Sequence, residues 1–158
     1  MGDVGRKGVL HWVYNAVRLI LGGLFLYAGI SKLSAPTEFA VIINSFGLVP
    51  SYTAGILSVL IPTLEIVAAV LLIFHVAGGL RLTFFQLLFF IGILTWGIHL
   101  GLDIDCGCFG PDDSEGQFYH SMRTAIVRDV VMVGGILFCA WYRRRWGVSP
   151  RKFSFVDK

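Results

Sequence analysis

Residues 52–74 read YTAGILSVLIPTLEIVAAVLLIF, and this stretch decides the fold class because Glu65 is its single formal charge. A helix needs about 20 predominantly apolar residues to cross the ~30 Å hydrocarbon core of a bilayer. A soluble core cannot bury so long an apolar run, whereas a bilayer accepts it as a helix with all its backbone groups hydrogen-bonded. The stretch therefore predicts a transmembrane helix.

Three more apolar stretches of similar length lie outward from this one, at residues 12–33, 82–102 and 122–142. The whole chain of 158 residues is 56% hydrophobic and only 15% charged. A typical soluble domain has about 25% charged residues. We therefore predict an all-α fold, an integral membrane four-helix bundle that forms one membrane domain over residues 1–158.

The connections between the predicted helices differ in character. Residues 75–81 form a short turn whose glycine pair is an ordinary helix stop. Apolar residues recur at helical spacing within residues 37–46, which predicts a short helix lying in the membrane interface. Residues 103–120 form an acidic loop that holds Cys106-Gly107-Cys108, and residues 143–158 form a basic tail.

Basic residues are distributed unevenly between the two sides of the predicted bundle. The side of the two termini collects Arg6, Lys7, Arg81, Arg143, Arg144, Arg145, Arg151, Lys152 and Lys158. The other side has Lys32, Arg123 and Arg128. Because cytoplasmic loops are enriched in Lys and Arg, we predict a multi-pass protein of a bacterial-type inner membrane with both termini in the cytoplasm. The partner of this surface is the lipid bilayer, and no nucleic acid is expected.

Cys106 and Cys108 are the sharpest candidates for chemistry, on the periplasmic or extracellular side where disulfides persist. Two thiols separated by one glycine can close a very small disulfide ring. Such a ring departs from relaxed disulfide geometry and should be easily reduced, which favours a redox-active pair. Binding of Cu(I) by the two thiolates and an inert structural turn are the alternatives.

Charged residues inside the predicted helices are the candidates for a supporting role. Arg128 and Asp129 are either a helix-end pair in interfacial water or a site where Arg128 stabilises an anion beneath the cysteine loop. Glu65 lies near mid-membrane, where it should be protonated or paired, as a structural hydrogen bond or a proton relay. Lys32 and Arg18 are predicted to be snorkelling anchors.

Three further residues have weaker signals. His99 shares a helix face with Trp96 that leads into the cysteine loop, as a satisfied polar residue or a proton carrier. His120 and the neighbouring arginines could offset the acidic charge of that loop. Cys139 is predicted to be a small buried apolar residue near the opposite membrane face. We expect Glu65, Arg128 and His99 to point into the bundle or a cavity.

Several segments of the chain resemble the DoxX-like superfamily. They are GGLFLYAGISKL at residues 22–33, FGLVP at residues 46–50 and PTLE at residues 62–65. The hexapeptide DCGCFG at residues 105–110 is similar to the MauE branch, the methylamine-utilisation type of redox-associated membrane protein. The resemblance covers residues 17–142. It implies a four-helix membrane bundle that serves disulfide formation or electron transfer for exported proteins, beside a thioredoxin-like partner.

The architecture is also similar to that of vitamin K epoxide reductase-type proteins, which couple periplasmic cysteines to a quinone. This sequence differs from them in having Cys-Gly-Cys and no second periplasmic cysteine pair. The leading hypothesis is a membrane thiol–disulfide oxidoreductase with Cys106 and Cys108 as the reacting groups. No covalently bound cofactor is expected, and a quinone held near His99 and Arg128 is the candidate electron carrier. The rivals are a non-catalytic subunit of a larger membrane complex and periplasmic copper handling.

Overall fold

The computed structural model describes residues 2–101 and 122–149, which form five helices. They are α1 (Gly2–Ser34), α2 (Pro36–Ser45), α3 (Ser51–Ile73), α4 (Gly79–His99) and α5 (Met122–Trp146). The fold class is all-α, as predicted. The short helix expected within residues 37–46 is α2, which begins one residue earlier because Pro36 occupies its first turn, where a missing N–H costs nothing.

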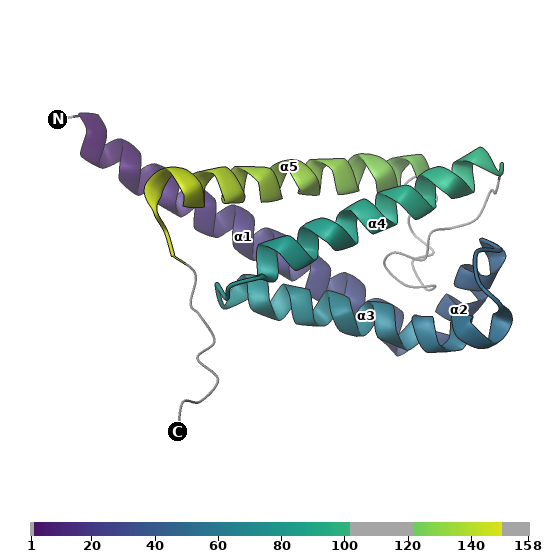
Figure 1. Ribbon diagram of the computed structural model, residues 1–158. Coiled ribbons are helices and arrows are strands. Elements are labelled where there is room, and N and C mark those ends of the chain that lie inside the picture. Colours follow the sequence, from purple (N-terminus) through teal and green to yellow (C-terminus); the bar gives the residue numbers. More distant parts are fainter. Residues whose placement is uncertain (1, 102–121, 150–158) are drawn as a thin grey trace, which may run out of the picture.

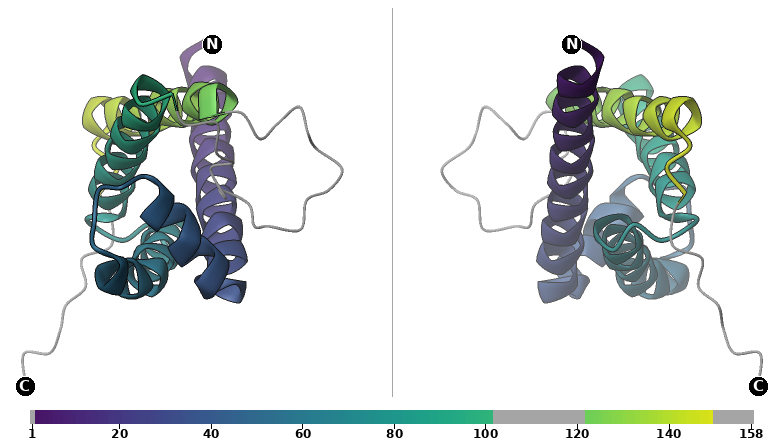
Figure 2. Two further views of the ribbon diagram at one scale, coloured as in Figure 1. Left: turned by 90° about the vertical axis from the view of Figure 1, so that its right-hand side faces the viewer. Right: turned by 90° about the vertical axis from the view of Figure 1, so that its left-hand side faces the viewer.

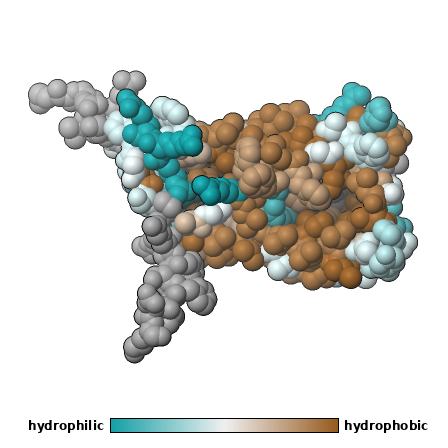
Figure 3. Space-filling model, viewed as in Figure 1, coloured by the Kyte–Doolittle hydropathy of each residue, from teal (hydrophilic) through white to brown (hydrophobic). Residues whose placement is uncertain are grey.

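Four of the helices are long and apolar enough to cross a membrane: Gly8–Ser34, Ser51–Ile73, Gly79–His99 and Arg123–Trp146. Large apolar side chains such as Trp12, Ile56, Phe85 and Val131 are exposed on their outer faces. An apolar band separates the hydrophilic ends of the molecule (Figure 3). Lipid is the solvent that suits such a surface, so the protein is a multi-pass membrane bundle.

The four long helices pack in a ring. The most extensive contact is between α1 and α3, and the next is between α4 and α5. α3 also packs on α4, and α5 packs on α1, which closes the ring. Successive long helices run antiparallel, so α4 ends and α5 begins at the end of the bundle that carries α2 (Figure 1). Seen from that end, α2 lies beside the ends of α1 and α3 (Figure 2). The opposite end carries the start of α1 and the basic last turn of α5.

Small residues allow α1 and α3 to approach closely. A Cβ atom placed on Gly22 would lie 2.6 Å from Ile73, and one on Gly29 would lie 2.8 Å from Ile66. Ala68 on α3 is fully buried in the core between the long helices. Small residues in apolar helices predict close helix approach at Gly22, Gly29, Ala68 and Gly134, and the structure confirms this for Gly22 and Gly29. The prediction is wrong for Gly134, which has nothing within 4 Å of an added Cβ.

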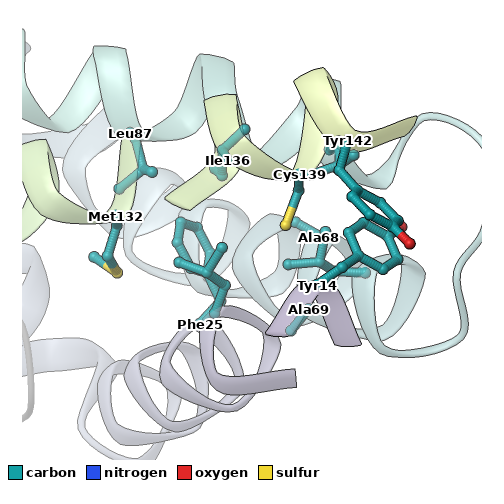
Figure 4. Packing of buried hydrophobic residues seen from close by; sticks show 12 residues of the cluster. Tyr14, Phe25, Ala68, Ala69, Leu87, Met132, Ile136, Cys139 and Tyr142 are labelled. Atoms are coloured by element: carbon teal, nitrogen blue, oxygen red, sulfur yellow. The ribbon is translucent and has the colours of Figure 1, made fainter. Parts of the chain in front are cut away.

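The core lies between the long helices, as Figure 4 shows for the end near Tyr14 and Tyr142. The rings of these two tyrosines stack with their centroids 4.8 Å apart. Cys139 is a free cysteine with 0% exposure, packed among the same residues. The prediction that it serves as a small buried apolar residue is confirmed.

The observed ends of the helices depart from expectation mainly at the tyrosine end of the bundle. α1 extends back to Gly2 and α5 continues through Arg143–Arg145 to Trp146, so the predicted tail begins as helix. α3 ends in a Schellman motif: the N–H of Val76 donates to the carbonyl of Leu71, and that of His75 to Leu72. Glycine usually occupies the left-handed position of this motif, but here it is His75, with φ 58°.

Candidate functional site

A cavity of about 250 Å³ lies at the α2 end of the bundle and is lined by all five helices. Most of its walls are apolar side chains, among them Phe39 and Phe46 of α2. Four charged residues also line it: Lys32, Glu65, Arg128 and Asp129. We call it the paired cavity, because these charges form two oppositely charged pairs. Charged groups in such surroundings are costly and usually mark function.

The first pair joins two transmembrane helices. Lys32 Nζ donates a hydrogen bond of 2.6 Å to Oε1 of Glu65, and both side chains are almost fully buried. The ammonium group also lies 5.7 Å from the ring centroid of Phe39 and 4.8 Å from that of Phe90. Aromatic faces attract a cation, most strongly where water is excluded. Lys32 is therefore held by an anion and two rings on three different helices.

Gly29 explains how Lys32 reaches its partner. A Cβ at this position would lie 3.0 Å from the carbonyl oxygen of Pro62 and 3.2 Å from Cβ of Glu65. Only glycine, with no side chain, permits so close an approach of α1 to α3. Residues three apart on a helix lie on the same face, so Lys32 projects toward α3 one turn beyond this contact.

The second pair lies on α5. Nε and Nη2 of Arg128 donate to Oδ1 of Asp129 at 3.0 and 2.9 Å. Asp129 is 2% exposed, whereas the Arg128 side chain is 29% exposed. A carboxylate buried to this degree requires a hydrogen-bonded cation. Arg128 and Asp129 thus form an ion pair in the wall of the cavity, with the carboxylate buried and the guanidinium partly exposed.

The two pairs also act on each other. Arg128 and Asp129 both interact electrostatically with Glu65, and Lys32 does so with Asp129. With all four groups ionised, two cations balance two anions and the cavity is neutral. Among the four charged side chains of this cavity, Oε2 of Glu65 is buried without a hydrogen-bond partner in the described residues. Buried polar atoms in native proteins are nearly always satisfied, so this oxygen offers an acceptor for a bound molecule.

Several predicted site residues come together here and one does not. The structure places Glu65 and Arg128 in the cavity wall, as expected. His99 is the last residue of α4 and is exposed, so the prediction that it points inward is wrong. Its ring lies 6.4 Å from that of Trp96, which confirms that the two share a face. The side chain of His99 lies at the end of its helix and therefore at the surface, where the imidazole stays hydrated.

The prediction that Lys32 is a snorkelling anchor is also wrong. The residue is 5% exposed and paired inside the bundle. Snorkelling relieves a lone cation near a helix end, but a buried carboxylate on the next helix offers a stronger interaction. The sequence held a signal for this outcome: Lys32 follows Gly29 by three residues, so it lies on the face that approaches α3.

The predicted reacting residues Cys106 and Cys108, together with His120, lie outside the described residues. The described chain contains both flanks of their segment, Gly101 after α4 and Met122 at the start of α5, at the end of the bundle that holds the paired cavity. Within residues 2–101 and 122–149, no three His, Cys, Asp or Glu side chains lie close enough to hold a metal ion.

The fold and the paired cavity define a class: a small multi-pass helical membrane protein with ion pairs buried in an apolar chamber. A family model described as methylamine utilisation protein MauE matches residues 10–142, and the chain belongs to this family.

One curated relative, the methylamine utilization protein MauE of Paracoccus versutus, is 33% identical over 116 residues. The match includes 69% of this chain and 59% of the relative, so the chain spans less than two thirds of that protein's length. No solved structure matches the chain significantly.

Proposed function

We propose that the protein is a membrane thiol–disulfide redox protein in which Cys106 and Cys108 cycle between dithiol and disulfide. The observation that carries the proposal is the paired cavity at the end of the bundle where α4 and α5 flank the cysteine segment. A buried charge cluster at the end of the bundle where the chain enters and leaves a Cys-Gly-Cys segment supports a redox site, because thiolate chemistry depends on nearby charges.

The exchange reaction follows from thiol chemistry. A thiolate of the motif attacks a sulfur of the partner's disulfide, the partner's S–S bond breaks, and a mixed disulfide forms. The second motif thiolate then attacks its neighbour in that mixed disulfide. The partner leaves with two thiols, and the bond between Cys106 and Cys108 is closed. Two electrons have moved to the partner, and the same steps in reverse oxidise it. A thioredoxin-like protein outside the membrane is the proposed partner.

A quinone is the proposed membrane electron carrier, and the chemistry of the paired cavity fits one. The walls are apolar, as an aromatic ring with an isoprenoid chain requires, and the few polar groups fix orientation. Lys32 and Arg128 present N–H donors for carbonyl oxygens, and Oε2 of Glu65 is positioned to hold a proton. A bound quinone would supply a two-electron, two-proton acceptor. The proposed site keeps Arg128 from the site expected from sequence and has Lys32 and Glu65 in place of His99.

The redox proposal is tested by alkylation mass spectrometry on native membranes, with and without reductant. Cys106 and Cys108 should be protected from alkylation until reductant is added. Of Cys106→Ser and Cys108→Ser, the variant that keeps the attacking cysteine should trap a mixed disulfide with a partner, and Cys139→Ser serves as the matched control. A motif that stays reduced under oxidising conditions would sink the proposal. Normal function of the double-serine variant would favour the non-catalytic subunit, and copper-dependent protection would favour metal handling.

The proposed orientation places both termini in the cytoplasm of a bacterial-type inner membrane and the cysteine segment in the periplasm. Basic residues in the last turn of α5 support it, since cytoplasmic flanks are rich in Arg and Lys. Asp113→Cys and Ser149→Cys, each in a background without native cysteines, should react with an impermeant reagent from opposite sides. Reaction of both from one side would overturn this topology.

A further inference from the structure

The tyrosine end of the bundle contains a second cavity that the proposed function does not use. Its volume is about 350 Å³, and it is lined by His11, Tyr14, Asn15, Arg18, Ile73, Phe74 and His75. We call it the basic cavity, because none of these seven lining residues is acidic and three can carry positive charge. Arg143 on α5 and Arg18 on α1 both interact electrostatically with Tyr14, so positive charge from two helices lies near this cavity.

Arg18 is the residue that points to a ligand. Its Nε is buried and has no hydrogen-bond partner among the residues that the structure describes. The guanidinium carbon lies 5.8 Å above the ring centroid of Tyr14, a contact that orients the group but uses none of its hydrogen-bond donors. An arginine beside an Asp or Glu side chain forms a bidentate pair with it, but no Asp or Glu is among the residues that line this cavity. An oxyanion in the cavity would supply the acceptor that the buried Nε lacks.

His75 is held in place at a conformational cost. Its φ of 58° is left-handed, a region that histidine, asparagine and aspartate enter more often than other side chains but at a greater cost than glycine. The Schellman motif fixes the backbone, and a 2.9 Å hydrogen bond joins Nε2 to the hydroxyl of Tyr14. Glycine would end α3 more cheaply. Strained residues held by surrounding structure cluster at ligand sites, and this imidazole sits in the wall of the basic cavity.

We infer that the basic cavity binds the tetrahedral oxyanion of a phosphate group, with Arg18 as its principal ligand and His75, Asn15 and His11 around it. Guanidinium and imidazole donors match phosphate oxygens in charge and geometry. The group belongs either to the headgroup of an anionic phospholipid or to free inorganic phosphate. The cavity opens at the membrane end where α5 carries Arg143, Arg144 and Arg145, which favours anionic headgroups there.

The test measures thermal unfolding of the purified full-length protein in two arms. One arm compares nanodiscs of phosphatidylcholine with nanodiscs that also contain phosphatidylglycerol, and the other titrates inorganic phosphate in a neutral detergent. Arg18→Gln is the test variant. Arg81→Gln is the matched control, because Arg81 is an exposed arginine at the start of α4, at the same end of the bundle.

Wild type and Arg81→Gln should gain stability from the phosphate-bearing ligand, and Arg18→Gln should bind it about tenfold more weakly or worse, the loss expected for one charge-assisted hydrogen bond. Stabilisation by phosphatidylglycerol alone assigns the site to a lipid, and stabilisation by inorganic phosphate assigns it to the free ion. The inference is overturned if Arg18→Gln responds like wild type in both arms, if wild type responds in neither, or if Arg81→Gln loses as much as Arg18→Gln.

A second variant guards against a folding defect at Arg18. Asparagine tolerates the left-handed conformation, so His75→Asn should keep the turn and fold normally while removing the imidazole. It should unfold at a somewhat lower temperature than wild type without ligand, because the Tyr14 hydroxyl loses its partner, and show a smaller shift with ligand. An unchanged shift, in a variant that folds normally, would remove His75 from the site.

Discussion

The two cavities at opposite ends of this bundle treat charge in contrasting ways. In the paired cavity Lys32 and Asp129 each have an oppositely charged partner within 3.0 Å, whereas Arg18 in the basic cavity has a buried Nε with no partner in the part of the chain that the structure describes. The first arrangement balances its own charges and keeps an apolar chamber neutral, with Oε2 of Glu65 as its one open acceptor among the four charged side chains. The second is incomplete without an anion. A membrane bundle can thus bury charge for two purposes: to set the environment of a reaction, or to receive a ligand.

The largest expected difference between the two cavities appears when one cation is removed from each. Lys32→Met leaves the Glu65 carboxylate buried without its cation, which should destabilise the fold by about 3–5 kcal/mol. Arg18→Met strands no carboxylate and should change stability by about 0.5 kcal/mol or less without ligand. Unfolding in detergent measures both.

A double variant sharpens this prediction. Glu65→Gln in the Lys32→Met background should restore most of the lost stability, because no unpaired buried charge remains. Equal destabilisation by Lys32→Met and Arg18→Met would show that the two cavities do not differ in the way proposed.

The close contact at Gly29 gives a second, smaller test of the paired cavity. Gly29→Ala places a methyl group 3.0 Å from a backbone oxygen of Pro62, so α1 must shift at a cost of about 1–3 kcal/mol. Gly23→Ala is the matched control, because an added Cβ there meets nothing within 4 Å. If both variants unfold alike, the spacing of α1 and α3 does not depend on Gly29.

Arg128 is expected to affect activity more than folding. Arg128→Lys keeps a cation near Asp129 but loses the two-point contact of the guanidinium. Turnover of the Cys106–Cys108 pair should slow about tenfold, the effect of one lost charge-assisted hydrogen bond, without stopping. Arg123→Lys, at an exposed position of the same helix, is the control. Alkylation time courses in membranes follow the rate, and equal rates in the two variants would contradict a role for Arg128.

Cys139→Ala should have the smallest effect. The thiol projects from α5 into the core beside the two stacked tyrosines, far along α5 from the paired cavity. Loss of one small buried group should cost about 1 kcal/mol, and the redox state of the other two cysteines should not change. A slower redox cycle in this variant would mean that Cys139 takes part in electron transfer.

Much of the fold was predictable because lipid imposes strong constraints. The apolar run with Glu65 as its single charge, and three runs like it, specify four spanning helices. Partners of buried charges were harder to predict. Which helix faces Lys32 depends on the ring order of the helices, and that order is set by shape contacts such as Gly29 against Pro62, which no periodicity reveals. The exposure of His99 depended on where α4 ends, and helix ends are poorly specified by sequence.

The continuity of α1 has one further consequence. Arg18, Gly22, Gly29 and Lys32 follow one another at intervals of four, seven and three residues, so they share one face of a single uninterrupted helix. Arg18 of the basic cavity and Lys32 of the paired cavity therefore lie on the same side of α1. A single residue inserted between Gly22 and Gly29 would turn the second half of α1 by about 100° relative to the first. Arg18 would keep its place, while Lys32 would swing away from Glu65 toward lipid.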